Sequence, residues 1–279
     1  MSKNGKTNGV ALSPVHPKPG ADRVDILLGT PTLGGITIEW YNMMVGCVTP
    51  PNWALVRSTP KGYLVADAQN MLVDTVLRSQ MRALLLIEDD TCPPAEAFIV
   101  FDRWFWKMER KKAPPVVSGL YHIKGSAETR TGKKGGIKLL GPEPLAYRGS
   151  GSRAYRDWNY GDVIWVSGVP TGALLVHRKV LEAWAAESDV ETYTLPGYPF
   201  PLKKIFQQPS RVWIENGGVH VASGTSDLWW SAETIKRGII QKAGWPAKYR
   251  SAPDSEHFPF IIDTSLHFKH VDRLTGVLY

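Results

Sequence analysis

Cysteine is scarce in this sequence, with only Cys47 and Cys92 among 279 residues. Two cysteines cannot form the disulfide framework of a small secreted domain, and they suit a reducing cytoplasm. We expect both to be buried small apolar side chains. The sequence also lacks a run of about 18 apolar residues that could cross a bilayer. The N-terminal lysines 3, 6 and 18 accompany no apolar segment of a secretory signal. We therefore expect a cytoplasmic protein with no membrane partner.

Two phosphate-binding patterns are also missing from the sequence. The first apolar stretch, residues 24–28, runs into Gly29-Thr30-Pro31-Thr32, which has neither the G-x-G-x-x-G nor the Walker spacing. A dinucleotide-binding domain and a P-loop enzyme therefore have no support. The loop formed by Thr30, Pro31 and Thr32 could instead hold a base or a ribose.

The composition is that of a globular protein, with 43% hydrophobic and 21% charged residues. A chain of this length can bury a sizeable core in one large or two small domains. Residues 1–22 contain no apolar periodicity, and we expect them to form a flexible tail. The remaining residues, 23–279, are expected to form one folded domain.

The periodicity of residues 23–279 predicts an α/β fold. Apolar runs at 24–28, 53–56 and 84–87 predict strands, and the patterns at 36–48 and 63–80 predict the helices between them. This alternation favours a mostly parallel, Rossmann-like sheet flanked by helices. Further along the chain, helices are expected at 95–111, 179–186 and 228–238, and strands at 116–121, 163–166, 173–177, 212–214 and 260–270.

Three consecutive acids, Glu88-Asp89-Asp90, follow the most apolar of these strands directly. Ligands bind at the carboxyl ends of strands in open α/β sheets, so these acids occupy a site by position. Three adjacent carboxylates also favour a neutralising cation, and their oxygen atoms suit Mg²⁺ or Mn²⁺. The alternative is a solvated turn, which is the commoner origin of an isolated acidic triplet.

Later in the chain, Asp227 lies at the start of a predicted helix, and His267 and His270 lie on the last predicted strand. Asp227 could be a simple capping acid, because Asp is favoured there. His267 and His270 are three residues apart, so we expect them on opposite faces of the strand.

The order of these features resembles a GT-A glycosyltransferase of the family-2 type and its phage relatives, over residues 23–272. Glu88-Asp89-Asp90 is similar to the D-x-D signature, with Glu in the first place. The stretch Gly168 to Gly172 and the strand after it resemble the family's acceptor-side strand. Ser226-Asp227 resembles its E-D pair, with Ser in place of Glu, and His270 resembles its late metal-binding histidine.

The resemblance implies a role for each of these residues. Asp90 and His270 would hold Mn²⁺ or Mg²⁺ on the diphosphate of a sugar nucleotide, with a UDP-sugar favoured, and Asp227 would be the catalytic base. The nucleotide-sugar contacts would come from residues after the predicted strands and from one side of the predicted helix 63–80: Thr30, Pro31, Thr32, Ser58, Asp67, Asn70, Glu88 and Asp89. Residues 23–121 would form the donor half and 163–279 the acceptor half.

Between these halves, residues 122–162 are expected to form a mobile basic loop. The formal net charge of the chain is +7, and residues 124–156 contribute eight basic residues, two acidic residues and seven glycines. Four aromatic residues near the end of this loop, Tyr147, Tyr155, Trp158 and Tyr160, add stacking surfaces. Positive charge with flat rings is typical of nucleic-acid binders, although a charge run alone is more often a solvated face.

We therefore expect the acceptor to be DNA with hydroxymethylated pyrimidines such as 5-hydroxymethylcytosine, as in phage enzymes that act in the host cytoplasm. A polysaccharide, glycan or protein acceptor remains an alternative, and so does a nucleotidyltransferase, which also uses paired acids after a strand. A DNA-binding module without activity would explain the basic loop but not the acids. The sequence leaves open the donor sugar, the base, the stereochemical course and the oligomeric state.

Overall fold

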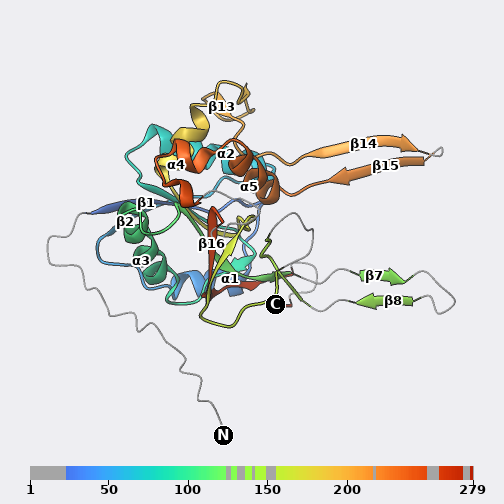
Figure 1. Cartoon of the computed structure of the whole chain (residues 1–279), viewed down its shortest axis with the longest axis horizontal. Helices are drawn as coiled ribbons and strands as arrows, with labels where there is room; N and C mark the ends of the chain where they lie inside the picture. Colours follow the sequence, from blue (N-terminus) through green and yellow to red (C-terminus); the bar gives the residue numbers. More distant parts are fainter. Residues whose placement is uncertain are drawn as a thin grey trace, which may run out of the picture.

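A computed structural model describes residues 23–123, 127–130, 136–139, 142–148, 155–215, 218–249, 258–272 and 277–278. The predicted tail 1–22 and parts of the predicted basic loop lie outside these residues. The described residues are organised around a seven-stranded sheet with helices on both faces (Figure 1). The predicted fold class, an α/β domain with a Rossmann-like sheet, is confirmed.

The strands of this sheet come from both halves of the chain. In spatial order they are β10 (Val163–Val166), β16 (Phe260–His267), β5 (Val116–Leu120), β11 (Ala173–His177), β3 (Ala83–Ile87), β1 (Val24–Gly29) and β2 (Trp53–Ser58). β2, β1 and β3 are parallel neighbours, and so are β5 and β16. β11 runs antiparallel to both β3 and β5, and β10 runs antiparallel to β16. β10 and β11 therefore run opposite to the other five strands, which share one direction.

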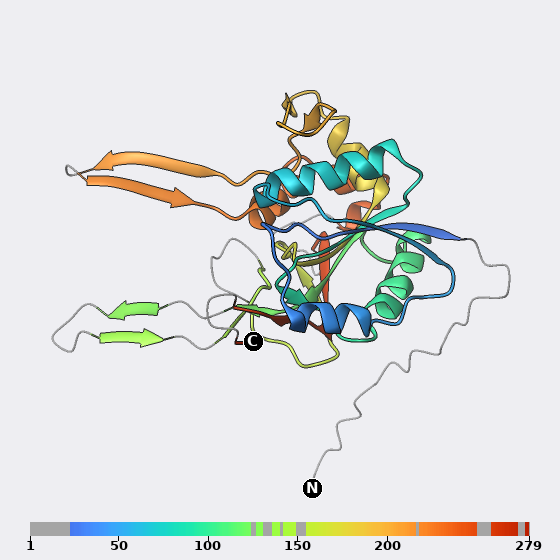
Figure 2. The same cartoon turned by 180° about the vertical axis from the view of Figure 1, so that it is seen from behind.

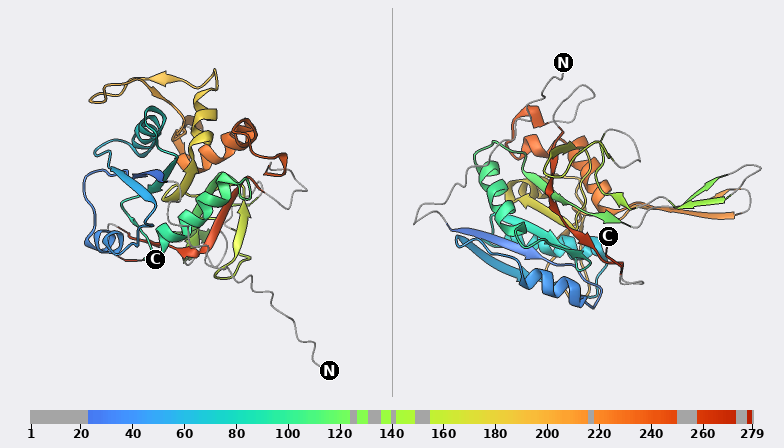
Figure 3. Two further views of the ribbon diagram at one scale, coloured as in Figure 1. Left: turned by 90° about the vertical axis from the view of Figure 1, so that its left-hand side faces the viewer. Right: turned by 90° about the horizontal axis from the view of Figure 1, so that it is seen from below.

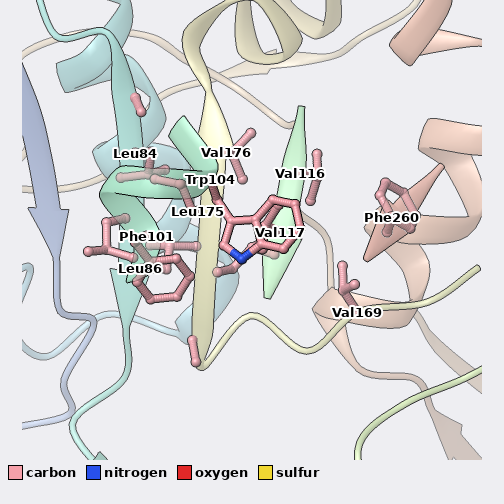
Figure 4. Packing of buried hydrophobic residues seen from close by; sticks show 14 of the residues in the cluster. Leu84, Leu86, Phe101, Trp104, Val116, Val117, Val169, Leu175, Val176 and Phe260 are labelled. Atoms are coloured by element: carbon pink, nitrogen blue, oxygen red, sulfur yellow. The ribbon is translucent and has the colours of Figure 1, made fainter. Parts of the chain in front are cut away.

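The centre of the sheet is buried on both faces, as the apolar run of β3 predicted. Leu84, Leu85, Leu86 and Ile87 are each 0% exposed. Leu84 and Leu86 lie among Phe101, Trp104 and other core side chains in Figure 4. Such a strand has no room for a charged side chain, so the carboxylates can begin only where the strand ends.

Helices cover the two faces of the sheet in separate layers. Figures 1 and 2 show α2 (Val65–Arg78), α4 (Arg178–Ala185) and α5 (Ser226–Lys236) on one face, and α1 (Ile38–Val45) and α3 (Ala97–Glu109) on the other. α2 buries one stripe that includes Leu72 and Val76, and α3 buries Phe98 and Phe101. This spacing of three or four residues is the pattern from which the helices were predicted. Within the described residues, no helix is both long and apolar enough to cross a bilayer.

Two antiparallel ribbons extend from the body of the molecule in the same direction (Figures 1 and 3). The first pairs β7 (Ala127–Arg130) with β8 (Gly136–Leu139), and the second pairs β14 (Ser210–Glu215) with β15 (Gly218–Ser223). The first ribbon lies where we expected a loop without regular structure. The second extends the short strand expected at 212–214 and adds a strand that we did not predict.

The remaining elements are short. β4 (Thr91–Cys92) pairs with β17 (Lys269–His270), β6 (His122–Ile123) with β9 (Glu143–Pro144), and β12 (Thr192–Tyr193) with β13 (Leu202–Lys203). A short helix α6 (Ile239–Lys242) and a 3₁₀ turn (Ala247–Tyr249) follow α5. Cys92 is buried as predicted, whereas Cys47 is only half-buried and donates through Sγ to the carbonyl oxygen of Met43.

Candidate functional site

The acidic triplet leaves the sheet at the carboxyl end of β3, as predicted. Its backbone is fixed on two sides, because Glu88 donates its N–H to the carbonyl oxygen of Gly172 at 3.1 Å and accepts at its own carbonyl from the Trp40 indole at 2.8 Å. Trp40 lies on α1 and Gly172 immediately precedes β11. Helix α1 and the residue before β11 therefore hold the main chain at the start of the triplet.

The pairing of β4 with β17 brings the end of the chain to this triplet. His270 lies opposite Thr91, and Val271 donates its N–H to the carbonyl oxygen of Asp90 at 2.8 Å. The Nε2 atom of His270 is 3.5 Å from Oδ2 of Asp90. The structure therefore brings together Asp90 and His270, which are 180 positions apart in the sequence.

Glu88 is bonded through its side chain to two further elements. Its Oε1 accepts from the Thr171 hydroxyl at 3.0 Å and lies 3.4 Å from Nε2 of Gln69, which is on α2. Burial, together with the negative charges of Asp90 and Asp227, raises the pKa of Glu88 to about 8. The charges of Glu88 and Asp227 therefore interact, although the two residues are 139 positions apart in the chain.

Asp227 lies in the first turn of α5, after the N-cap residue Thr225. Its Oδ1 accepts from the N–H of Leu228 at 2.8 Å. Burial raises the pKa of Asp227 above its usual value, while hydrogen bonds from Thr225 and Leu228 act in the opposite direction. The prediction that Asp227 begins a helix is confirmed, and the helix directs this carboxyl group towards the same region as Glu88.

Tyr121 forms one wall of this region. Its ring stacks on that of His270, with centroids 5.8 Å apart and planes 9° apart. Burial, together with the charges of Glu88, Asp227 and Asp90, raises the pKa of the Tyr121 hydroxyl well above its usual range, so it stays protonated and can donate a hydrogen bond.

Glycine is required at position 172 because the site leaves no space there. A Cβ atom on Gly172 would lie 2.6 Å from the Tyr121 hydroxyl oxygen and 2.7 Å from Oγ1 of Thr91. The close approach of β11 to β4 and Tyr121 thus depends on the absence of a side chain. This glycine belongs to the stretch Gly168 to Gly172, for which we noted a resemblance in the sequence.

The chemistry of these groups suits a divalent cation. Two donor atoms 3.5 Å apart, one carboxylate oxygen and one imidazole nitrogen, can both reach an ion at ordinary bond lengths of about 2.0–2.3 Å. Within the described residues, no group of three or more His, Cys, Asp or Glu side chains is arranged to hold a metal ion. An ion held by Asp90 and His270 would therefore need further oxygen ligands from water or from a substrate such as a diphosphate.

The predicted nucleotide-contact residues of the first two strands lie at the same edge of the sheet. Thr30 follows β1 and donates its N–H to the carbonyl oxygen of Ser58, the last residue of β2. Thr32 accepts from the N–H of Gly34 through Oγ1, and Pro31 lies buried between the two threonines. These residues and the triplet follow adjacent parallel strands, so they form one rim at the carboxyl ends of β2, β1 and β3.

Asp67 and Asn70 contact a different part of the molecule from the one we expected. Asp67 accepts from the Tyr193 hydroxyl at 2.7 Å. Oδ1 of Asn70 accepts from the N–H groups of Ile205 and Phe206, and its Nδ2 donates to the carbonyl oxygen of Phe206. The two side chains fasten α2 to residues 193–206. Gln69, between them in sequence, is the α2 residue that contacts the acidic cluster.

The other histidine of the last strand also lies apart from Asp90. Nε2 of His267 is 3.2 Å from Nδ1 of His122, and the two rings meet edge to face.

Asp89, the middle acid of the triplet, is only 4% exposed. Of the predicted residues, Glu88, Asp89 and Asp90 lie together, with His270 beside Asp90 and Asp227 within range of the charge of Glu88.

Sequence reasoning missed four residues of the site: Trp40, Gln69, Tyr121 and Thr171. Tyr121 carried a usable signal, because it directly follows a buried strand, as the acidic triplet does. Thr171 lies within a glycine-containing stretch that had already been singled out. Trp40 and Gln69 are helix residues with nothing unusual around them, and only the packing of α1 and α2 reveals their contacts.

Comparison with known proteins adds little to this geometry. No family model matches the sequence, and no curated protein matches it. Among solved structures, the chain is similar to A197 from STIV, with 13% sequence identity, a TM-score of 0.44, and coverage of 88% of this chain and 85% of that one. A likeness of this size carries no argument about function.

Proposed function

We propose that this protein is a metal-dependent glycosyltransferase that moves a sugar from a nucleoside-diphosphate sugar, with a UDP-sugar favoured, to a hydroxyl acceptor. The observation that carries the proposal is the 3.5 Å approach of Asp90 to His270 at the carboxyl end of β3, with Glu88 and Asp227 in the same electric field. A cluster of acids with one imidazole suits a substrate that brings its own negative charge together with a divalent cation.

Asp90 and His270 would hold that cation, Mn²⁺ or Mg²⁺. A divalent ion bound there would act as a Lewis acid on the diphosphate, whose negative charge grows as the bond to the sugar breaks. The stacking of His270 on Tyr121 and the hydrogen bond of Val271 to Asp90 would fix the two ligands before the donor arrives. Fixed ligands cost no reorganisation during the reaction.

Asp227 would accept the proton of the attacking hydroxyl. Burial raises the pKa of Asp227 and so makes it a stronger base than an exposed aspartate. The α5 N-terminus and the Leu228 N–H act in the opposite direction, because both stabilise the negatively charged carboxylate. Glu88, held through Oε1 by Thr171 and Gln69, is suited to contact the sugar or ribose hydroxyls of the donor.

We propose DNA with hydroxymethylated pyrimidines as the acceptor, because both ribbons are close in the sequence to residues of the site. The β7–β8 ribbon follows Tyr121 by six residues, and β15 ends four residues before Asp227. Residues 127–139 contain four basic residues and one acidic residue. Two arms extending the same way from the catalytic edge suit a long acceptor better than a small saccharide, and a base within a duplex must be flipped out to react.

The aromatic residues near the basic segment differ in their availability for stacking on bases. The Arg148 guanidinium lies 4.0 Å from the centre of the Tyr155 ring, so one face of that ring is already covered. Trp158 packs against the core and donates to the carbonyl oxygen of Tyr155. Tyr160 is 71% exposed and is therefore the best placed of the four predicted rings to meet a base.

The test is a transfer assay with a panel of radiolabelled nucleotide sugars, Mn²⁺ or Mg²⁺, and either hydroxymethylated or unmodified DNA. We expect label in the modified DNA and release of a nucleoside diphosphate. Release of pyrophosphate would identify a nucleotidyltransferase instead. Labelling of polysaccharide or protein but not of DNA would keep the donor chemistry and overturn the acceptor. Metal-independent DNA binding with no transfer would overturn the enzyme altogether.

A further inference from the structure

Helix α1 presents apolar side chains to solvent on the side where an amphipathic helix normally carries polar ones. Trp40 and Met44 face the core and are 8% and 2% exposed. On the opposite side, Ile38, Tyr41 and Val45 are 65%, 51% and 63% exposed. Their spacing of three and four residues places them on one face of the helix.

The residues that flank α1 extend this apolar face. Leu33 and Ile36, in the loop between β1 and α1, are 69% and 47% exposed, and Val48, after the helix, is 57% exposed. Ile36 precedes the N-cap Thr37, a position whose side chain ordinarily packs on the residue that Tyr41 occupies. We call this surface the α1 face; it consists of Leu33, Ile36, Ile38, Tyr41, Val45 and Val48.

The α1 face is large for an apolar surface that stays in water. Six large apolar side chains at these exposures leave on the order of 600 Å² accessible, the upper end of the largest apolar patch found on a typical monomer. A stable dimer of standard size buries about 800 Å² on each partner. The α1 face with its polar rim is therefore large enough to form the core of such an interface.

We propose that the α1 face is the contact between two copies of this chain. Two copies of one short helix can pack antiparallel about a two-fold axis, so that the face with Ile38 and Val45 meets its own equivalent. The face carries no like charges that such packing would bring together at its centre, where Asn42 is the polar residue. This inference goes beyond the proposed activity and does not depend on it.

A lipid surface is a poorer occupant for the same face. Helices that lie in a membrane interface combine an apolar face with Lys and Arg on the polar face. α1 has the sequence IEWYNMMV, which contains no basic residue and one acidic residue, Glu39. This helix therefore offers no positive charge to anionic lipid headgroups, and only the burial of its apolar side chains would favour membrane binding.

Association through α1 would also brace the site. Trp40, on the inner side of the same helix, holds the Glu88 carbonyl oxygen through its indole N–H. The loop before α1 contains Thr30 and Thr32 at the rim described above. A partner copy packed against the outer side would restrict the motion of the helix and of this loop.

The test is the mass of the full chain in solution, measured by sedimentation equilibrium at protein concentrations around 10–100 µM. We expect twice the chain mass of 31.0 kDa for the native protein and the single mass for the double variant Ile38→Lys/Val45→Lys. Val163→Lys is the matched control: Val163 is also an exposed apolar residue, at 44%, but it lies on β10 at the opposite edge of the sheet from β2. This control should remain a dimer.

Two further measurements keep the inference testable if the double variant does not fold, which its circular dichroism spectrum would reveal. Asn42→Cys should form a disulfide-linked dimer under mild oxidation, whereas a cysteine introduced at Val163 should not. Native protein that is monomeric at 100 µM, or a folded double variant that remains dimeric, overturns the proposal. A monomer that sediments with phosphatidylserine vesicles through Ile38 and Val45 would overturn it in favour of a lipid surface.

Discussion

Asp90 and Asp227 lie on different elements of the site, and their proposed tasks can be separated by mutation. Removing the Asp90 carboxylate leaves His270 as the only one of the two proposed ligands, so Asp90→Ala should lose the rise in melting temperature that a nucleotide sugar gives with Mn²⁺. Asp227→Ala should retain that rise, because Asp227 is not a proposed ligand, and should lose turnover by about 10²- to 10⁴-fold. Thermal-shift and transfer assays on the same preparations check both expectations.

Each variant needs a control for folding. Asp74→Ala removes an aspartate of α2 whose partners, Arg78 and Tyr198, are not among the site residues, so donor binding and turnover should be unchanged. Normal turnover by Asp227→Ala would exclude it as the base. A metal-dependent shift that survives in Asp90→Ala would exclude the proposed cation site.

Asn70 is a structural residue, and its replacement should lower stability rather than abolish chemistry. Its amide group makes hydrogen bonds with the backbone of Ile205 and Phe206 while being only 2% exposed. Asn70→Ala would leave three buried backbone groups without this partner, at a cost of about 2–4 kcal/mol in the free energy of unfolding. Urea denaturation measures this loss. If stability is unchanged but donor binding fails, our first expectation of a nucleotide contact at Asn70 was correct.

At the scale of elements, the strands and helices that position the site follow from local patterns. The run at 84–87 predicts β3 because only a strand buried on both faces carries four large aliphatic residues together. Helices α2 and α3 follow from their apolar stripes, with ends that lie within two residues of those expected. These features are set by neighbours in sequence, so the sequence reveals them.

The β14–β15 ribbon shows why other elements were missed. The sequence Asn216-Gly217 between two β-branched stretches is a strong hairpin signal, and attention to it would have predicted β15. The β7–β8 ribbon gives a weaker signal because glycine and lysine dominate its sequence. The contacts of Gln69 with Glu88 and of Trp40 with the Glu88 carbonyl depend on how whole helices pack, which periodicity does not encode.

The junction between α3 and α4 provides a pH-dependent prediction. Nδ1 of His177 accepts from the N–H of Lys179, so Nε2 carries the proton and donates to Oε1 of Glu109 at 2.8 Å. Arg82 lies 3.0 Å from the other oxygen of Glu109. The hydrogen bond from His177, helped by the charge of Arg82, lowers the pKa of Glu109 to about 2.

Because the folded-state pKa lies below the usual 4.5, this carboxylate stabilises the fold at pH values above about 4.5, and the contribution disappears as the pH falls towards 2. With allowance for solvent screening at a partly exposed group, we expect about 1–2 kcal/mol. Glu109→Gln should thus be less stable than the native chain at pH 6, and the difference should be several-fold smaller at pH 2.5. Denaturation curves at both pH values check this, and a constant difference would contradict it.

At the scale of the molecule, the site is assembled from segments that are far apart in the chain. β16 enters the sheet beside β5, and β17 then places His270 next to Asp90. No pattern within a short window links residue 90 to residue 270, so the resemblance, rather than periodicity, suggested that they meet. The net charge could be counted from the sequence, because it does not depend on how the chain folds.

That charge leads to a prediction about salt. If residues 124–156 contact phosphates, each contact releases counterions, and the affinity for DNA should fall about 40- to 150-fold between about 50 and 200 mM salt for three or four contacts. Binding of the sugar nucleotide should change far less, because it depends on a cation held by Asp90 and His270 at short range. Filter binding with DNA and thermal shifts with the donor, over one salt series, separate the two effects.

Lys133→Glu/Lys134→Glu should reduce the salt slope for DNA, because two cations no longer displace counterions, and should leave the donor-dependent thermal shift unchanged. Lys236→Glu is a suitable control: it also reverses a lysine's charge, and Lys236 lies on α5, paired with Glu233. A native slope near zero would remove the reason to assign a polyanionic acceptor. The cation site would still stand in that case, since it rests on Asp90 and His270, and the search for an acceptor would turn to neutral glycans.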